Sequence, residues 1–268
     1  MFGCSSGCTV LRFNFVWDRI VVDLLGHRLK FGVIAPSTNT IVQPEFDAMR
    51  PRGVTNHFSR IHIPDDPLGS DADFELLMER IRAELMQAVD RVMTARPAHL
   101  VMGMSSETFW GGLAGSVELK AKLEERGGIP VTMGSDASQA ALSQYGDIRR
   151  IAVMTPYMPV GDTEVRKFFT ETGFEVLAIK GFKCESPTLI AHITAEQMRD
   201  AVNELNDPQV EAILQVGTNL AFAHIAPMAE FWLDKPVLAI NTATYWHALR
   251  QNGIDDRIPG FGSLLEDF

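Results

Sequence analysis

The amino-acid sequence predicts an α/β protein of two pseudo-symmetric lobes, each a mainly parallel, doubly wound sheet, with an inter-lobe cleft. Short apolar runs that end in small polar residues alternate with longer segments whose apolar residues recur every three or four positions. This alternation is typical of a parallel sheet with helices on both faces. The series of runs occurs twice, which indicates an internal duplication.

The first half begins with LKFGVIAPSTNT, a buried strand that ends in a polar loop. In DADFELLMERIRAELMQAVDRVMTAR the apolar positions lie three and four residues apart, which predicts an amphipathic helix. AHLVMGMSS follows as a strand and loop, and SVELKAKLEERGG as a helix that stops at Gly127 and Gly128. IPVTMGSDASQAALSQYG completes this half as strand, loop and helix.

The second half repeats the series. IRRIAVMTPYMPV parallels LKFGVIAPSTNT, VEAILQVGTNL parallels AHLVMGMSSET, and KPVLAINTATYWHALRQNG parallels IPVTMGSDASQAALSQYG. Between them lie a helix, DTEVRKFFTETG, a strand with its loop, FEVLAIKGFKCESPT, and a helix with a capping box at Thr194 and Gln197. The matched pairs keep their order, so we expect a first lobe at residues 29–146 and a second at residues 147–268.

Composition limits the functions open to this chain of 268 residues. A net charge of −10 argues against nucleic-acid and anionic-membrane partners, because both need clustered lysine and arginine. No apolar stretch has membrane-spanning length. The three cysteines are an odd number without framework spacing, which indicates a reducing compartment. A cytoplasmic location is therefore expected.

Residues 1–28 are interpreted as an N-terminal extension ahead of the first lobe. Asp18, Arg19 and Asp23 interrupt their apolar part, and no small-residue cleavage site follows, so a signal peptide is not expected. Cys4 and Cys8 lack a second ligand pair nearby, which makes a zinc site a weak interpretation.

The strand-end loops of both halves are expected to meet at one cleft, because ligands of such sheets bind at the carboxyl ends of the strands. These loops carry small hydroxyls, amides and a phenol, a set that suits a carboxylate, although the same residue types also cap helices. No metal-ligand cluster and no nucleotide-binding glycine motif occurs, so no cofactor or metal is expected. The loop residues are Pro36, Ser37, Thr38, Asn39, Met104, Ser105, Ser106, Ser135, Asp136, Thr155, Pro156, Tyr157, Gly217, Thr218, Asn219, Asn241 and Thr242.

These motifs resemble the aspartate/glutamate racemase superfamily and, within it, maleate cis-trans isomerases and arylmalonate decarboxylases. GVIAPSTNT is similar to the opening strand and loop of maleate isomerases, MSSETFWGG to a decarboxylase segment, and AVMTPY to a segment with an active-site tyrosine. The resemblance covers nearly all of residues 29–268. It implies that Asn39 contacts substrate, that Ser105 and Ser106 bind its carboxylate, and that Tyr157 lies in the active site. The full expected substrate-binding set is Ser37, Asn39, Ser105, Ser106, Thr218 and Asn219.

The chain departs from the superfamily at its catalytic cysteines. Their positions correspond here to Met104 and Gly217, whose side chains can neither carry a proton nor attack carbon. The resemblance therefore implies a non-cysteine proton donor. Tyr157, with its pKa lowered from about 10, and Ser106 are the catalytic candidates. Cys184 is a possible substitute, and Glu107, Asp136 and His224 are weaker alternatives.

The leading hypothesis is a cofactor-independent enzyme, maleate isomerase-like or arylmalonate decarboxylase-like, that acts on a small carboxylate or dicarboxylate. One alternative is hydrolysis of a small cyclic or amide substrate by a water that the hydroxyl-rich cleft orients. The other is a non-catalytic small-acid binding protein that kept the cleft and lost the chemistry. The resemblance also implies a homo-oligomer.

Overall fold

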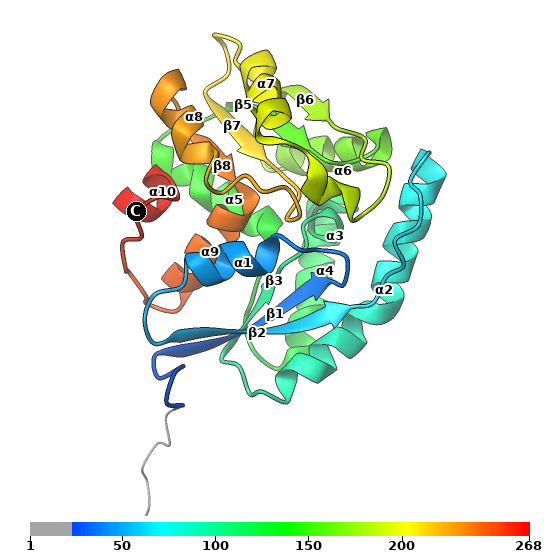
Figure 1. Ribbon diagram of the computed structural model, residues 1–268, viewed down its shortest axis with the longest axis vertical. Coiled ribbons are helices and arrows are strands. Elements are labelled where there is room, and N and C mark those ends of the chain that lie inside the picture. Colours follow the sequence, from blue (N-terminus) through cyan, green and yellow to red (C-terminus); the bar gives the residue numbers. More distant parts are fainter. Residues whose placement is uncertain (1–22) are drawn as a thin grey trace, which may run out of the picture.

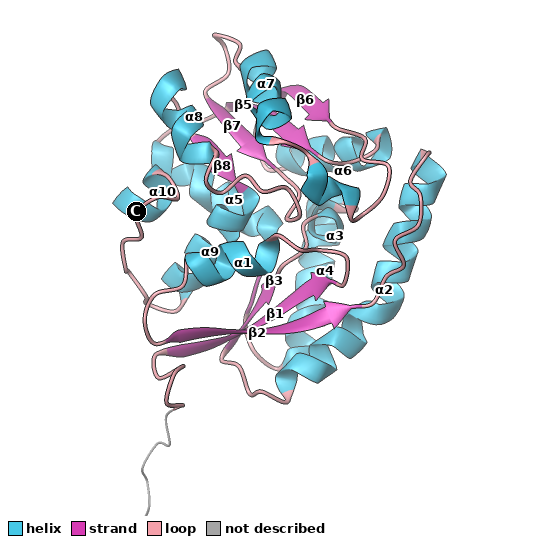
Figure 2. Ribbon diagram, in the orientation of Figure 1, coloured by secondary structure: helices cyan, strands magenta, loops and turns pink. Residues whose placement is uncertain are grey.

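The chain forms two four-stranded parallel sheets with helices on both sides of each sheet (Figure 1, Figure 2). The computed structural model describes residues 23–268, so Cys4 and Cys8 lie outside the described residues. The strand order is β2-β1-β3-β4 in one sheet and β6-β5-β7-β8 in the other. The two orders are equivalent, which confirms the predicted fold class of two pseudo-symmetric α/β lobes.

The strands of the two sheets correspond one to one. The first sheet consists of β1 (Leu29–Pro36), β2 (Val54–Ile61), β3 (His99–Met102) and β4 (Val131–Thr132), and the second of β5 (Arg150–Thr155), β6 (Glu175–Gly181), β7 (Ala212–Gln215) and β8 (Val237–Ala239). β1 and β5 pair with a strand on each side, and nearly all their residues are buried. They read as continuous apolar runs because helices cover both faces of the sheet.

The helices follow the strands in alternation. They are α1 (Val42–Ala48), α2 (Asp71–Met93), α3 (Ser106–Phe109), α4 (Gly112–Gly127), α5 (Gly134–Leu142), α6 (Pro159–Glu171), α7 (Ala195–Leu205), α8 (Ala226–Leu233), α9 (Ile240–Gln251) and α10 (Ser263–Asp267), with short 3-10 turns at Ser143–Tyr145 and Leu189–His192. The sequence did not predict α1, α3, α8 and α10, because each is too short for apolar periodicity to show.

Helix α2 is the longest element and buries the stripe that its spacing predicted. Phe74, Ile81 and Leu85 are buried, and the Phe74 ring packs on Trp110 and Tyr157. Leu77 is half-buried and lines the pocket described below. The Ser70 side chain caps the helix by accepting a hydrogen bond from the backbone N–H of Asp73. This stripe fixes the helix so that its first turns border the space between the lobes.

The structure corrects where the strand in AHLVMGMSS ends. β3 stops at Met102, and Gly103 turns the chain while its N–H donates to the carbonyl of Ile34 at 2.8 Å. Met104 therefore lies in the loop beyond the strand, buried at the edge of the sheet. The capping box predicted at Thr194 and Gln197 is confirmed at the start of α7.

The two halves of the chain exchange contacts through one helix. α9 follows β8 in the second sheet, yet it packs on α5 and also contacts β3 and β4 of the first sheet. Figure 1 shows it beside α1, in the region of the first sheet. The halves are thus joined by packed helices as well as by the linker. The lobe boundary between residues 146 and 147 stays a prediction.

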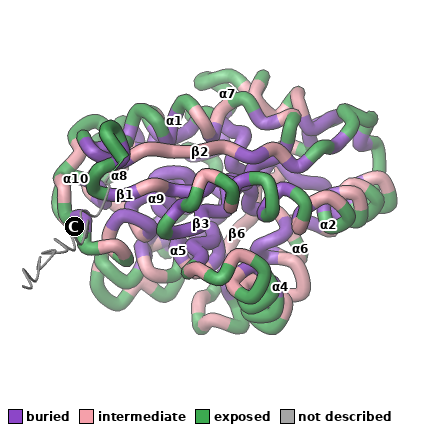
Figure 3. Tube along the Cα trace, turned by 90° about the horizontal axis from the view of Figure 1, so that it is seen from below, coloured by how far each residue is buried: buried purple, intermediate pink, exposed green. Residues whose placement is uncertain are grey.

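Burial divides the described residues into an inner and an outer layer (Figure 3). The inner strands β1, β3, β5 and β7 are mainly buried, and the edge strands β2 and β6 are mostly of intermediate burial. α2 and α4 turn exposed faces outward. No helix among residues 23–268 is long and apolar enough to cross a membrane.

Candidate active site

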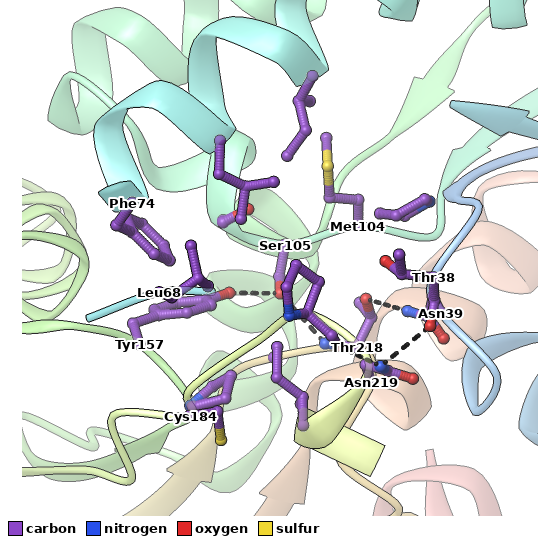
Figure 4. A pocket seen from close by; sticks show the side chains of 18 of the residues that line it. Thr38, Asn39, Leu68, Phe74, Met104, Ser105, Tyr157, Cys184, Thr218 and Asn219 are labelled. Carbon is purple, nitrogen blue, oxygen red and sulfur yellow. Dashed lines mark hydrogen bonds between the residues drawn. The ribbon is translucent and has the colours of Figure 1, made fainter. Parts of the chain in front are cut away.

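A pocket lies between the lobes, at the loops that follow β1, β3, β5 and β7 (Figure 4). Two further segments complete it, the connection from β2 into α2 and the loop after β6. The pocket is lined by Pro36, Thr38, Asn39, Ile63, Leu68, Phe74, Leu77, Ile81, Met104, Ser105, Ser106, Pro156, Tyr157, Met158, Cys184, Pro187, Ile190, Gly217, Thr218 and Asn219. The loops of both halves therefore meet at one site.

Asn39 joins the first lobe to the second at the base of the pocket. Its Oδ1 accepts hydrogen bonds from the backbone N–H groups of Ile41 and Val42, which fixes the loop that leads into α1. Its Nδ2 donates to the Thr218 hydroxyl at 3.0 Å, across the lobes. Ser37, which was expected beside it, is exposed and bonds the backbone of Ile63 instead of lining the pocket.

Ser105 is the centre of a second bridge between the lobes. Its hydroxyl shares a 2.7 Å hydrogen bond with the Tyr157 hydroxyl and accepts one from the Thr218 N–H at 3.3 Å. The Thr218 hydroxyl in turn donates to the carbonyl of Gly103 at 3.1 Å. Figure 4 shows these groups converging from both lobes. The bridge fixes Tyr157 and Thr218 relative to the loop after β3.

Asn219 also connects loops at the pocket through its side-chain amide. Its Oδ1 accepts from the N–H of Thr40 at 3.0 Å, and its Nδ2 donates to the carbonyl of Pro187 at 3.0 Å. One side chain thereby connects three loops that border the pocket.

Two hydroxyls at the pocket have no hydrogen-bond partner among the described residues. Within residues 23–268 the side chains of Thr38 and Ser106 make no hydrogen bond, and both are partly exposed. Asn39, Ser105, Thr218 and Asn219 also line the pocket, but their polar atoms are already engaged with the protein. The role of Ser106 as an anion-binding hydroxyl stays a prediction that this geometry favours.

The opposite wall is apolar and was missed by sequence reasoning. Leu68 comes from the segment before α2, and Phe74, Leu77 and Ile81 come from one face of α2. The helical spacing of the last three was visible, but periodicity indicates a buried face and not which cavity the face borders. No charged side chain lines the described pocket.

Comparison with known proteins places the chain in a family. Residues 32–265 match the family described as arylmalonate decarboxylase. The chain belongs to the arylmalonate decarboxylase family. It thus lies in the aspartate/glutamate racemase-like superfamily, as the sequence predicted, among enzymes that are isomerases or decarboxylases.

Individual relatives agree with this family. The maleate isomerase of Alcaligenes faecalis is 25% identical over 249 residues, which cover 88% of this chain and 96% of the relative. The maleate cis-trans isomerase of Nocardia farcinica, solved as a cysteine-to-serine mutant with a covalently bound succinylcysteine intermediate, is 22% identical with a TM-score of 0.81 over 90% of this chain and 99% of its own. A crystal structure of arylmalonate decarboxylase is 20% identical with a TM-score of 0.70, over 88% of this chain and 98% of its own.

This member of the arylmalonate decarboxylase family has no room for a side chain at residue 217. Gly217 has a φ of +119°, which L side chains rarely adopt, and a Cβ placed there would lie 2.5 Å from Cδ of Pro156. Met104, at the other predicted cysteine position, is buried in the pocket wall. The positive φ and the Pro156 ring together therefore disfavour a thiol at residue 217, one of the two positions where the resemblance predicts a cysteine.

The titratable groups of the pocket are held in their protonated forms. Burial raises the pKa of Tyr157 well above its ordinary value, although its hydrogen bond with Ser105 opposes the shift. The expectation of a lowered tyrosine pKa was therefore wrong, because loss of hydration outweighs one hydrogen bond. Burial likewise raises the pKa of Cys184 to about 11. Both groups therefore carry their proton at neutral pH.

The other candidate bases do not line the pocket. The carboxylate of Glu107 forms a paired contact with the guanidinium of Arg82, at 2.6 Å and 3.1 Å. Asp136 bonds Lys120 at 2.6 Å. The exposed His224 contacts the backbone of Gly260.

Several residues that were expected in the cleft do not line the pocket. Thr155 bonds Asp162, Ser135 bonds Ser116, Asn241 bonds Glu45, and the Thr242 hydroxyl is buried without a partner within the described residues. No group of three or more His, Cys, Asp or Glu among residues 23–268 is placed to hold a metal ion.

Proposed function

We propose that this protein decarboxylates a small malonate-type acid, with Tyr157 as the proton donor. The observation that carries the proposal is the lining of the pocket, which includes no charged side chain among the described residues. The titratable side chains that line it are Tyr157 and Cys184, and the raised pKa of each keeps it protonated at neutral pH. The site therefore supplies protons but no base and no ionised nucleophile.

Among the reactions of the family, decarboxylation needs neither a base nor an ionised nucleophile from the protein, so this pocket suits it best. Racemisation requires a base on one face of the carbon, and nucleophilic isomerisation requires an ionised attacking group. In decarboxylation the bond to one carboxylate carbon breaks, carbon dioxide leaves, and the electron pair passes into the remaining carboxyl group as an enediolate. The Tyr157 hydroxyl then gives its proton to the α-carbon, and the tyrosinate takes a proton from water.

The two walls of the pocket suit this reaction. The free hydroxyls of Thr38 and Ser106 offer hydrogen bonds to the carboxyl group that remains and becomes more negative. The apolar wall of Leu68, Phe74 and Leu77 favours loss of the other carboxylate, because a charged group is poorly solvated there and neutral carbon dioxide is not. The same wall accommodates an apolar substituent on the α-carbon.

A non-catalytic protein that binds the same acids is the second candidate. Gly217 favours it, since a φ of +119° and the contact with Pro156 remove a family position for chemistry. Turnover separates the two candidates. We also propose a cytoplasmic homo-oligomer, which is supported by the cysteine count and by the resemblance to the family.

The test is to incubate the protein with methylmalonate and phenylmalonate in deuterated water. We expect carbon dioxide to be released and one deuterium to appear at the α-carbon. Tyr157→Phe is expected to lower kcat by about 10²–10⁴-fold, the usual contribution of a general acid. Tyr145→Phe is the matched control, because Tyr145 is a partly buried tyrosine that bonds Ser263 away from the pocket.

Cys184→Ser distinguishes the two proton donors. If Tyr157 donates the proton, the serine variant keeps its activity and thiol alkylation matters only through steric block. Loss of activity in Cys184→Ser with full activity in Tyr157→Phe would assign the step to the thiol. Binding of either acid without carbon dioxide release would favour the binding protein.

A further inference from the structure

Glu45 is a buried carboxylate that forms no ion pair with any residue of the described range 23–268. It lies on α1, six residues after Asn39, and is only 8% exposed. Its Oε1 accepts a hydrogen bond from the backbone N–H of Ala223 at 3.1 Å, and its Oε2 accepts one from Nδ2 of Asn241 at 2.6 Å. Both donors belong to the second half of the chain, so a first-lobe carboxylate holds second-lobe groups.

These two bonds fix both ends of the loop that carries Thr218. Ala223 is near the end of this loop, which we define as residues 216–223. Asn241 reaches its beginning, because the same Nδ2 also donates to the carbonyl of Thr218 at 3.0 Å. Thr218 and Asn219, in between, form one wall of the pocket. The ionised carboxylate therefore sets the position of that wall.

The amide of Asn241 is poised to respond to a proton on Glu45. Its Oδ1 is buried and has no hydrogen-bond partner within the described residues. A protonated Glu45 must donate through one oxygen, and this orphaned acceptor is available once the amide turns over. The turned amide would then place Oδ1 against the Thr218 carbonyl, so the bond that holds the loop would be replaced by repulsion between two acceptors.

Within the described part of the chain, no charged side chain shifts the pKa of Glu45. Burial raises its pKa to about 7, its two hydrogen bonds oppose the shift, and no charged side chain contributes. The titratable groups on the elements around it have other partners: Asp47 of α1 and Tyr245 of α9 bond Asn56, Arg60 of β2 bonds Gln43, and His224 of the loop after β7 bonds Gly260.

We propose that Glu45 is a positioning residue whose ionised form orders the 216–223 loop and whose protonation releases it. The proposal deepens the decarboxylase proposal and rests on it only where turnover is concerned. It predicts that the pocket wall is ordered above neutral pH and loosened below it. Activity would therefore fall on the acid side as Glu45 gains its proton.

The first test follows the loop itself and needs no substrate. Hydrogen exchange of residues 216–223 is measured from pH 5.5 to pH 8.5 and corrected for the intrinsic exchange rate. The parent protein is expected to gain roughly tenfold protection towards high pH, the usual effect of one hydrogen bond to a charged group. Glu45→Gln is expected to show weak protection at every pH, because it resembles the protonated carboxyl.

Two further variants serve as a second probe of the link and as a control for the hydrogen-exchange test. Asn241→Ala removes the link to Thr218, so it is also expected to lose the pH dependence of loop exchange, even if Glu45→Gln does not fold. Glu230→Gln is the matched control, since Glu230 is a partly buried carboxylate on α8 with a raised pKa that bonds Ser263. It is expected to keep the parent profile.

The outcomes separate this inference from the proposed function. A parent-like exchange profile in Glu45→Gln or in Asn241→Ala overturns the role of Glu45. A profile that depends on Glu45, with no decarboxylation by any variant, supports the switch and rejects the decarboxylase. If malonates are turned over, the acid limb of kcat/KM is expected to disappear in Glu45→Gln and to persist in Glu230→Gln.

Discussion

At the scale of single residues, the pocket divides its polar atoms between structure and ligand. Asn39, Ser105 and Thr218 bond one another across the lobes, while the hydroxyl of Ser106 faces the pocket unbonded. The first group therefore shapes the pocket, whereas the Ser106 hydroxyl has no hydrogen-bond partner among the described residues. Residue type alone does not make this distinction, since all four side chains are small and polar.

Ser106→Ala is expected to weaken binding of a small carboxylate by about 1–3 kcal/mol, the usual loss on removing a hydrogen bond to a charged group. Titration calorimetry with methylmalonate measures the change. Ser143→Ala is the control, because Ser143 is exposed and bonds only the nearby carbonyl of Ala140. Equal affinity in the two variants would show that Ser106 does not bind the anion.

Gly217→Ala is expected to destabilise the protein by about 3 kcal/mol or more, because the new Cβ meets Pro156 in a backbone conformation that alanine avoids. Gly128→Ala is the matched control. Gly128 also has a positive φ of +67°, but nothing lies within 4 Å of its Cβ position, so only the backbone cost of about 1 kcal/mol applies. Urea unfolding compares them, and similar losses would contradict the steric argument.

At the scale of elements, sequence motifs predicted a helix or strand correctly where the hydrogen bonds of the motif lie within the segment itself. The TAEQ motif predicted the start of α7, and the structure shows both bonds of its capping box. β2 was missed, since VTNHFSRI is largely polar and only partly buried at the edge of its sheet. An edge strand depends on its neighbour β1 more than on an apolar pattern of its own.

Thr194→Ala is expected to lower the free energy of unfolding by about 1 kcal/mol through loss of the cap of α7. The proposed decarboxylation should be unchanged, because α7 contributes no residue to the described pocket. Thr163→Ala is the comparison, since Thr163 lies inside α6 and its hydroxyl bonds the carbonyl of Pro159. A loss no larger than that of Thr163→Ala would argue against the cap.

At the scale of the whole molecule, one polar chain ties the two halves together near α9. The Nε2 of buried His99 in β3 shares a 2.7 Å hydrogen bond with the Thr132 hydroxyl, which donates to Gln251 at the end of α9. Burial, with smaller effects from Lys120 and His247, lowers the pKa of His99 to about 4. Below pH 6.5, His99 therefore binds a proton in the unfolded chain but stays neutral in the folded protein until about pH 4.

This shift predicts an acid sensitivity of definite sign. Between pH 6.5 and pH 4 the unfolded chain binds the His99 proton and the folded chain does not, so stability falls as pH falls. The loss between pH 7 and pH 5 is expected to be about 2 kcal/mol. His99→Gln should remove this component, measured by urea unfolding at both pH values, whereas His224→Gln, at an exposed position, should retain it.

Glu45 changes the free energy of unfolding with pH in the direction opposite to His99. The unfolding measurement must therefore distinguish the two contributions. Its pKa is raised to about 7, so the folded state holds its proton longer and stability falls as pH rises from about 4.5 to 7. The difference between His99→Gln and the parent isolates His99. If the two proteins show the same pH dependence, His99 is not the acid-sensitive group.

The sequence by itself determined the class of fold, the duplication and the short set of loops that meet at the cleft. These features follow from residue spacing, because apolar periodicity specifies each element and the carboxyl ends of parallel strands share one edge. Asn39, Ser106, Tyr157 and Thr218 were expected at the cleft in this way, and all four line the pocket. The assignment of the family's cysteine positions to Met104 and Gly217 stays a prediction from the resemblance.

Only the tertiary structure decided how these residues behave. The pKa of Tyr157 rises because the packed lobes remove its water, which sequence cannot show. Ser37 faces outward and Ser106 inward although both follow buried strands. The contact of Gly217 with Pro156, the apolar wall from α2 and the Glu45 cluster join residues far apart in the chain. Such contacts depend on how the two lobes pack, and no local pattern encodes that packing.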